Sequence, residues 1–116
     1  MPGPNKVVLM VDQAERRLTD VFKALADPHR RTMLRRLAHG PCSPTELTRP
    51  LHMTLQGVIK HLRVLEHAHL IRLHKTGRKL VASPEPQTLR AAGQSIDHIR
   101  DGWESRPPGT IPGPAH

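Results

Sequence analysis

The sequence contains almost no aromatic residues and only one cysteine. Phe22 and Trp103 are the only aromatic side chains, and tyrosine is absent. The core must therefore be aliphatic and rich in alanine, which favours packed helices over a β-sandwich. Single-stranded nucleic acid is a poor candidate ligand, because the aromatic platforms on which bases stack are missing. With Cys42 alone there is no internal disulfide and no thiolate cluster, which fits a reducing compartment.

Long hydrophobic runs are also missing. The longest, Val7–Val11, is too short for a signal peptide or a transmembrane helix. We therefore expect a cytoplasmic protein with no membrane partner. A chain of 116 residues is long enough for one domain with a single modest core.

Negative charge is scarce in the middle of the chain. The formal net charge is +8, and residues 28–83 alone carry +9, whereas residues 1–27 are balanced and residues 84–116 carry −1. Because the excess is concentrated in one region, it predicts a module that binds a polyanion between two nearly neutral flanks.

Helical periodicity begins with a stripe at Leu18, Val21, Phe22 and Leu25. A second helix is predicted between Asp27, which can cap its start, and Gly40, which ends it. The buried face of this second helix is expected to consist of Met33, Leu34 and Leu37.

The next two predicted helices are joined by a tight turn. Ser43 and Glu46 have the spacing of a capping box for a short helix that Pro50 ends. Thr54 can cap the longer helix that follows, whose apolar stripe is Leu55, Val58, Leu62 and Leu65. The opposite face of that helix is polar and mostly cationic, with Gln56, Lys60, Arg63 and His67.

Two short apolar segments then flank Lys75-Thr76-Gly77-Arg78, which predicts a β-hairpin with a cationic tip. Ser83 and Pro84 are predicted to open the last helix. Its apolar stripe needs a partner helix to cover it and consists of Leu89, Ala92, Ile96, Ile99 and Trp103. The expected fold is mainly α with a small β-hairpin, in the order helix, helix, helix, helix, strand, strand, helix. This is a winged helix-turn-helix.

Three segments are expected along the chain. Residues 1–12 are predicted to be a flexible N-terminal segment. Residues 13–104 form the winged helix-turn-helix domain for DNA binding and dimerisation. Residues 105–116, rich in proline and glycine, are predicted to be a disordered tail.

Two stretches resemble the ArsR/SmtB family of bacterial transcriptional regulators. "VFKALADPHRRTMLRRLAHGPCSPTEL" is similar to that family's opening helices, and "MTLQGVIKHLRVLEHAHLIRLHKTGRKLVAS" is similar to its recognition helix and wing. The resemblance covers about residues 18–104. It implies a homodimeric repressor that binds operator DNA until a signal changes its affinity. It further implies a dimer joined through the first and last helices, for which we expect contacts from Leu18, Val21, Phe22, Ile96, Ile99 and Trp103.

The expected DNA-binding residues divide by role. Base edges are expected to be reached by Gln56, Gly57, Lys60 and His61. Phosphates are expected to be held by Thr54, Arg63, Lys75, Thr76, Arg78 and Lys79. Gly57 is assigned through its small size, which would let the helix approach the groove closely.

Four histidines, His61, His67, His69 and His74, lie close together in the sequence. They fall on a helix, its end and a strand, so they are not expected to converge on a metal. His69 stands where the family usually has glycine. We therefore expect it to adopt a left-handed conformation at the end of the recognition helix.

No resident cofactor is expected. The family's thiolate sites use a Cys-x-Cys motif, whereas Cys42 stands alone, and the last helix departs from the family's other metal motif because its aspartate and histidine are adjacent. If nickel or zinc binds, the candidate ligands are Asp97, His98, Asp101, Glu104 and His116.

The sequence therefore predicts a regulator that binds double-stranded DNA in a sequence-specific manner and represses transcription. One alternative is a nickel- or zinc-responsive repressor of the same fold. A second is a winged-helix adaptor that binds a protein partner. No arrangement of residues typical of an enzyme is present.

Overall fold

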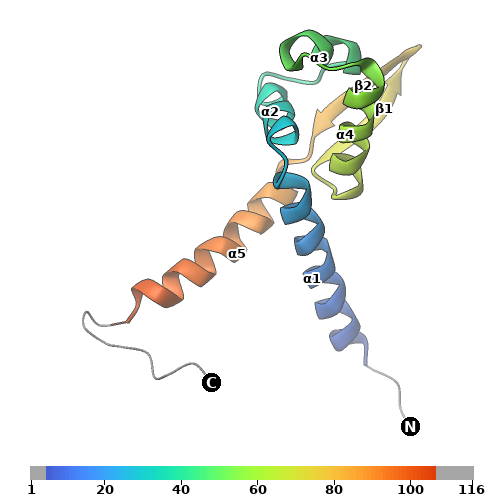
Figure 1. Ribbon diagram of the computed structural model, residues 1–116. Coiled ribbons are helices and arrows are strands. Elements are labelled where there is room, and N and C mark those ends of the chain that lie inside the picture. Colours follow the sequence, from blue (N-terminus) through green and yellow to red (C-terminus); the bar gives the residue numbers. More distant parts are fainter. Residues whose placement is uncertain (1–4, 107–116) are drawn as a thin grey trace.

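A computed structural model describes residues 5–106 (Figure 1). The elements follow the predicted order: α1 Lys6–Leu25, α2 Pro28–Leu37, α3 Pro44–Leu51, α4 Leu55–His67, β1 Ile71–Thr76, β2 Lys79–Pro84 and α5 Pro86–Glu104. The strands form one antiparallel pair in which Thr76 faces Lys79 and Ile71 faces Pro84. None of the helices described is both long and apolar enough to cross a bilayer.

Helices α2, α3 and α4 and the hairpin form a compact head (Figure 1). Its core is aliphatic, as the composition requires, with Met33, Leu47, Leu62 and Leu65 almost completely buried. Each fully buried side chain of this size contributes about 1.5–3 kcal/mol relative to an exposed one. Leu55 departs from the predicted stripe because it lies in the first turn of α4, where it is 42% exposed.

The predicted caps fix where the helices of the head begin. Asp27 accepts a hydrogen bond from the Arg30 backbone N–H at 3.0 Å, and Thr54 accepts one from the Gly57 N–H at 3.1 Å. At the start of α3, the Glu46 carboxylate accepts from the Ser43 backbone N–H at 3.0 Å. These bonds satisfy donors that a helix cannot pair internally.

Helix α1 begins earlier than the sequence predicted. It starts at Lys6, where Asn5 caps it by accepting from the Val8 N–H at 2.9 Å. Residues 6–12, expected to belong to a flexible segment, are therefore helical, whereas residues 1–4 lie outside the described part. Periodicity missed these turns because Val7–Val11 is apolar on every side and has no stripe.

Helix α5 begins later than predicted. Ser83 and Pro84 belong to β2, where Ser83 pairs with Arg72, and the helix opens at Pro86 after Glu85. Two prolines suit a first helical turn here. The helix begins at Pro86 and not at Pro84 because the Glu85 N–H donates to the Leu70 carbonyl at 3.0 Å. This bond keeps the chain beside the hairpin as far as Glu85.

The two long helices extend away from the head and diverge (Figure 1). The radius of gyration is 18.8 Å, whereas a compact chain of this length has about 13 Å. Only Val21 and Ala24 of α1 and Ala92 of α5 are buried. Leu18 and Leu25 of α1 are partly buried against the core, and the large apolar side chains further along both helices are exposed in the protomer.

Two histidines adopt left-handed backbone conformations at helix ends. His69, after α4, has φ of 60°, which confirms the prediction made for it. His52, at the end of α3, has φ of 52°, and the sequence did not predict this. Both residues end a helix sharply, as glycine does in a C-terminal cap.

Candidate nucleic-acid interface

A helix-turn-helix is formed by α3, the turn His52–Thr54 and α4. The left-handed His52 reverses the chain directly after α3, and its N–H donates to the Arg49 carbonyl at 3.1 Å. Thr54 then caps α4. The turn is short because His52 ends α3 and Thr54, two residues later, caps α4.

The outer face of α4 carries the polar residues that the sequence assigned to it. Gln56, Lys60 and Arg63 are all exposed, and they lie one turn apart along the helix. Val58, Leu62 and Leu65 on the inner face are fully buried. The helix is therefore fixed by its apolar face while a cationic face is free to contact a polyanion.

Gly57 lies on α4 next to its cap. A Cβ atom at this position would come within 3.2 Å of both the Met53 Cε and the Thr54 Oγ1. The small size of Gly57 therefore lets the Thr54 cap and the Met53 side chain close over the first turn, in addition to the role expected of it at the groove.

The wing has the predicted cationic tip. Lys75, Thr76, Arg78 and Lys79 are all exposed around the turn. Gly77 takes φ of 63° at the first of the two loop positions, where two-residue hairpins favour glycine. His74 lies further back, with its Nε2 2.8 Å from the Ser83 Oγ on the opposite strand.

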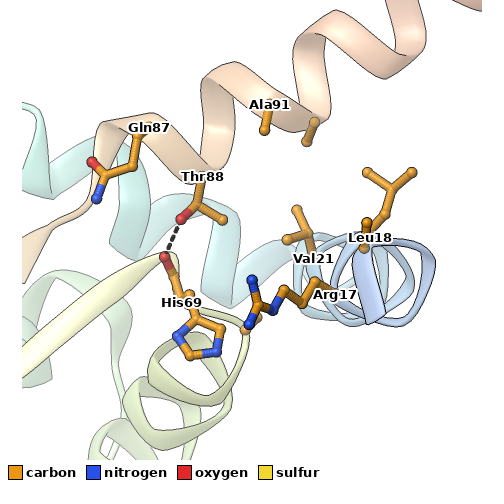
Figure 2. A pocket seen from close by; sticks show the side chains of 10 residues that line it. Arg17, Leu18, Val21, His69, Gln87, Thr88 and Ala91 are labelled. Atoms are coloured by element: carbon orange, nitrogen blue, oxygen red, sulfur yellow. Dashed lines mark hydrogen bonds between the residues drawn. The ribbon is translucent and has the colours of Figure 1, made fainter. Parts of the chain in front are cut away.

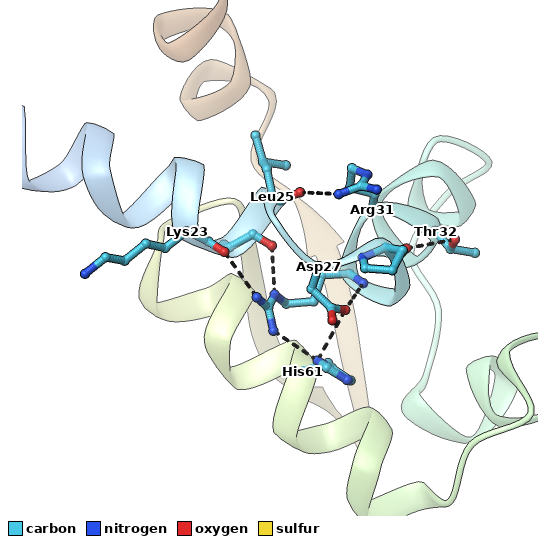
Figure 3. A network of polar contacts seen from close by, with 9 residues as sticks. Lys23, Leu25, Asp27, Arg31, Thr32 and His61 are labelled. Carbon is cyan, nitrogen blue, oxygen red and sulfur yellow. Dashed lines mark hydrogen bonds and ion pairs between the residues drawn. The ribbon is translucent and has the colours of Figure 1, made fainter.

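His61 does not share the outer face of α4. Its side chain turns toward the start of α2, where Nδ1 lies 3.2 Å from the Arg30 guanidinium and 3.9 Å from the Asp27 carboxylate (Figure 3). Burial lowers the pKa of His61 below 6.5, against the opposing effect of Asp27. We therefore withdraw His61 from the expected base-reading residues and interpret it as a residue that orients α4.

A groove beside the turn contains residues that sequence reasoning missed. It has a volume of about 570 Å³ and is lined by Thr48, Arg49, His52, Met53 and Thr54. Arg49 and His52 are exposed there, next to the start of α4. The sequence offered one signal for this site, because Arg49 is a basic residue in the last turn of α3, the first helix of the helix-turn-helix.

The acidic face of α5 is occupied by a cation of the protein itself. Arg100 lies 3.4 Å from Asp97, 3.3 Å from Asp101 and 3.7 Å from Glu104. Within residues 5–106, no group of three or more histidine, cysteine, aspartate or glutamate side chains is arranged to hold a metal ion. The candidate ligand His116 lies outside the described residues.

Cys42 is structural. It is 3% exposed and forms a short bridge to the hairpin, in which backbone hydrogen bonds of 3.1 and 2.8 Å join it to Ala82. Burial raises the pKa of its thiol, despite the opposing effect of Arg36.

Comparisons with known proteins agree with this geometry. A family model for a helix-turn-helix domain matches residues 25–74. The chain is 38% identical over 78 residues to the HTH-type transcriptional regulator Rv2034 of Mycobacterium tuberculosis, covering 67% of this chain and 73% of that protein. It is 31% identical over 111 residues to the HTH-type transcriptional regulator NmtR of the same organism, covering 91% and 92%.

Solved structures give the same result. The crystal structure of the ArsR family transcriptional regulator RHA00566 matches with a TM-score of 0.74 and 38% identity, covering 80% of this chain and 96% of that one. The chain belongs to the ArsR family. As a member of the ArsR family it is a DNA-binding transcriptional regulator of the repressor type and not an enzyme. Its winged helix-turn-helix is the DNA-binding unit of that family.

Proposed function

We propose that this ArsR family protein represses transcription as a homodimer that binds operator DNA through α4 and the wing. The observation that carries the proposal is the exposed cationic surface shared by the two elements. Lys60 and Arg63 project from α4, and Lys75, Arg78 and Lys79 surround the hairpin tip. A helix of this kind fits the major groove, and a hairpin beside it reaches the neighbouring backbone. Such a regulator would act on the chromosome in the cytoplasm.

Base reading is assigned to Gln56 and Lys60. They lie one turn apart on the outer face of α4, and glutamine favours adenine while lysine favours guanine. Gly57 lies between them in the sequence, and its small size would let the helix approach the groove closely.

Phosphate contacts are assigned to the residues around this pair. They comprise Thr54, which caps α4, and Arg63 of α4, the wing residues Lys75, Thr76, Arg78 and Lys79, and two additions from the groove beside the turn, Arg49 and His52. Contacts of this kind fix the register of the protein on the duplex without reading its sequence.

A second copy of the chain is the proposed cover for α1 and α5. Phe22 is 39%, Ile96 52%, Ile99 55% and Trp103 75% exposed, which is the pattern of a seam that the protomer cannot bury. Val21 is removed from the expected interface because it is 3% exposed and already belongs to the protomer's core. Leu18 is half-buried against the same core. The exposed apolar residues Val7–Val11 of α1 are added to the proposed interface.

The cleft between α1 and α5 supports the same dimer (Figure 2). It has a volume of about 490 Å³, and its lining includes Leu18 and Val21 of α1 and Ala91 and Ala92 of α5. This lining is mainly apolar and runs into the exposed seam. Apolar side chains of a second copy would fill it, which would join the two DNA-binding heads into a two-fold unit.

No resident metal is part of the proposal. Arg100 forms ion pairs with Asp97, Asp101 and Glu104, which favours an ordinary solvated face of α5 over a nickel or zinc site. Metal content after purification without a histidine tag, together with DNA affinity before and after added nickel or zinc, tests this. A stoichiometric metal that changes the affinity would replace the proposal with the metal-responsive alternative.

The test of the whole proposal is selection of bound sequences from random duplex DNA. We expect an imperfect inverted repeat whose half-sites are about 10 base pairs, or a multiple of this, apart. Gln56→Ala should relax preference at one position in each half-site, at about 1–3 kcal/mol per lost pairing. Arg78→Ala should weaken binding to every sequence and reduce the salt slope by about one unit per subunit.

The two variants serve as controls for each other. If both lower affinity equally on all duplexes, α4 is not the base-reading helix. If no duplex is enriched and affinity has no steep salt dependence, the protein-binding adaptor becomes the better reading.

A further inference from the structure

The Arg30 guanidinium of α2 contacts both α1 and α4, in the polar network around Lys23, Asp27 and His61 (Figure 3). Its Nε donates to the Ala24 carbonyl at 2.7 Å, and one terminal nitrogen donates to the Lys23 carbonyl at 3.1 Å. These carbonyls belong to the last turn of α1, where the helix leaves acceptors short of internal donors, and the Lys23 carbonyl also accepts from the Ala26 N–H at 3.2 Å. The other terminal nitrogen lies 3.2 Å from His61 Nδ1 on α4. One side chain of α2 therefore ties the end of α1 to the middle of α4.

This contact specifies the protonation state of His61. A guanidinium can only donate hydrogen bonds, so this contact is a hydrogen bond when Nδ1 is the unprotonated nitrogen and the ring proton lies on Nε2. The charged groups that face the ring are Asp27, His29 and Arg30 from α2 and Lys60 from α4 itself. Burial lowers the pKa of His61, Asp27 opposes this, and the proximity of Arg30, His29 and Lys60 lowers the pKa further. The neutral ring is the form that fits the folded protein.

A proton on Nδ1 would break this arrangement. The imidazolium has no acceptor, so it would lose the bond from Arg30 and face the guanidinium as a second cation. Its nearest partner would then be Asp27 Oδ2, 3.9 Å away. That oxygen already accepts the Arg30 backbone N–H and caps α2. Protonation would therefore break the link between α1 and α4 through Arg30 and draw the ring toward the carboxylate that caps α2.

We propose that His61 is a positioning residue for DNA recognition, whose neutral ring fixes the orientation of α4 through Arg30 and whose protonation releases that helix and weakens DNA binding. The proposal rests on the proposed function, because α4 carries the base-reading residues. Through Arg30, hydrogen bonds also link α1, which carries part of the proposed dimer interface, to α4, the proposed DNA-reading helix. His61 acts through the placement of Gln56 and Lys60 and not by touching a base.

The direction of the pH effect follows from the lowered pKa. Because the unfolded chain binds the proton more readily, the contribution of His61 is complete above about pH 6.5 and is lost as the pH falls below it. Other histidines have the opposite effect, since exposed imidazolium groups near phosphates strengthen binding. The test must therefore separate His61 from the rest.

His61→Asn provides that separation, since asparagine keeps an acceptor near the place of Nδ1 and cannot be protonated. The matched control is His67→Asn, an exposed histidine of the same helix. Affinity for the duplex selected above would be measured by fluorescence anisotropy from about pH 7.5 to about pH 5.5. We expect wild type to lose about three- to tenfold in affinity relative to His61→Asn across this range. Over the same pH range, the DNA affinity of wild type should not fall relative to that of His67→Asn.

Three results would overturn the proposal, and they are distinguishable. A constant ratio between wild type and His61→Asn, with DNA binding intact at neutral pH, removes the role of His61 alone. Failure of every protein to bind duplex DNA at any pH removes the proposed function as well. The third readout needs no variant and no DNA: NMR of the wild-type ring should show the Nε2–H tautomer with a pKa below 6.5. A proton on Nδ1 or a raised pKa would contradict the mechanism.

Discussion

Individual residues at helix ends replace glycine in this chain. His69 takes φ of 60°, and its carbonyl accepts a hydrogen bond from the Thr88 hydroxyl of α5. The conformation is therefore held by a contact to another helix, although a side chain with a Cβ is strained in it.

Replacing His69 by glycine should relieve that strain without removing the backbone contact. We expect His69→Gly to be neutral or to stabilise the fold by up to about 1 kcal/mol, measured by urea denaturation. His67→Gly, two residues earlier and within α4, is the control and should destabilise by about 1 kcal/mol. If His69→Gly is the more damaging of the two, the ring of His69 makes a contact that outweighs the strain.

Arg30 cannot be replaced by lysine without loss, although the charge is kept. A single ammonium group cannot reach the two carbonyls of α1 and the ring of His61 together. Arg30→Lys should lower the free energy of unfolding by about 1–3 kcal/mol, because the part-buried Ala24 carbonyl and His61 ring lose a hydrogen-bond donor. Arg35→Lys, at an exposed position of the same helix, should change it by less than about 0.5 kcal/mol. Equal effects in thermal unfolding would show that the Arg30 contacts contribute little.

At the scale of elements, the inner and outer faces of α4 carry separate tasks. Leu62 is fully buried between the head's helices, whereas Val64, two residues later, is 38% exposed. Leu62→Ala should destabilise the fold by about 2–5 kcal/mol, because it removes apolar contacts and leaves a cavity. Val64→Ala should cost well under about 1 kcal/mol. Chemical denaturation of both variants measures the difference, and similar losses would mean that α4 is seated differently on the core.

At the scale of the whole molecule, the exposed apolar side chains of α1 and α5 indicate an assembly that covers them. Trp103 is 75% exposed in the protomer, so Trp103→Ala should leave the protomer's fold almost unchanged. If a second copy buries the ring, the substitution should weaken the dimer by about 3 kcal/mol or more, which is about 100-fold in its dissociation constant. Sedimentation at several concentrations measures this, and Val64→Ala should not alter it.

The same tryptophan gives an independent check, since it is the only one in the chain. Its emission should shift to shorter wavelength as wild-type concentration rises and the ring leaves water. A wild-type protein that sediments as a monomer at micromolar concentration, with unshifted emission, would remove the dimer from the proposal.

Most of the head could be predicted from the sequence because its signals are local. Caps such as Asp27 and Thr54 act on N–H groups three residues away, and the stripe of α4 follows from the helical period alone. The errors lie where local signals were absent or duplicated. The apolar turns of α1 had no stripe, and Pro84 and Pro86 offered two equally good starts for α5.

The sequence by itself determined the element order, the concentration of positive charge in residues 28–83 and the outward row of Gln56, Lys60 and Arg63. Only the tertiary structure decided the role of His61. Neighbouring positions on α4 made it look like a groove residue, but its partner Arg30 is thirty-one residues away. Buried polar groups take whichever partners the fold brings within reach, because an unpaired one is costly, and periodicity carries no information about those partners.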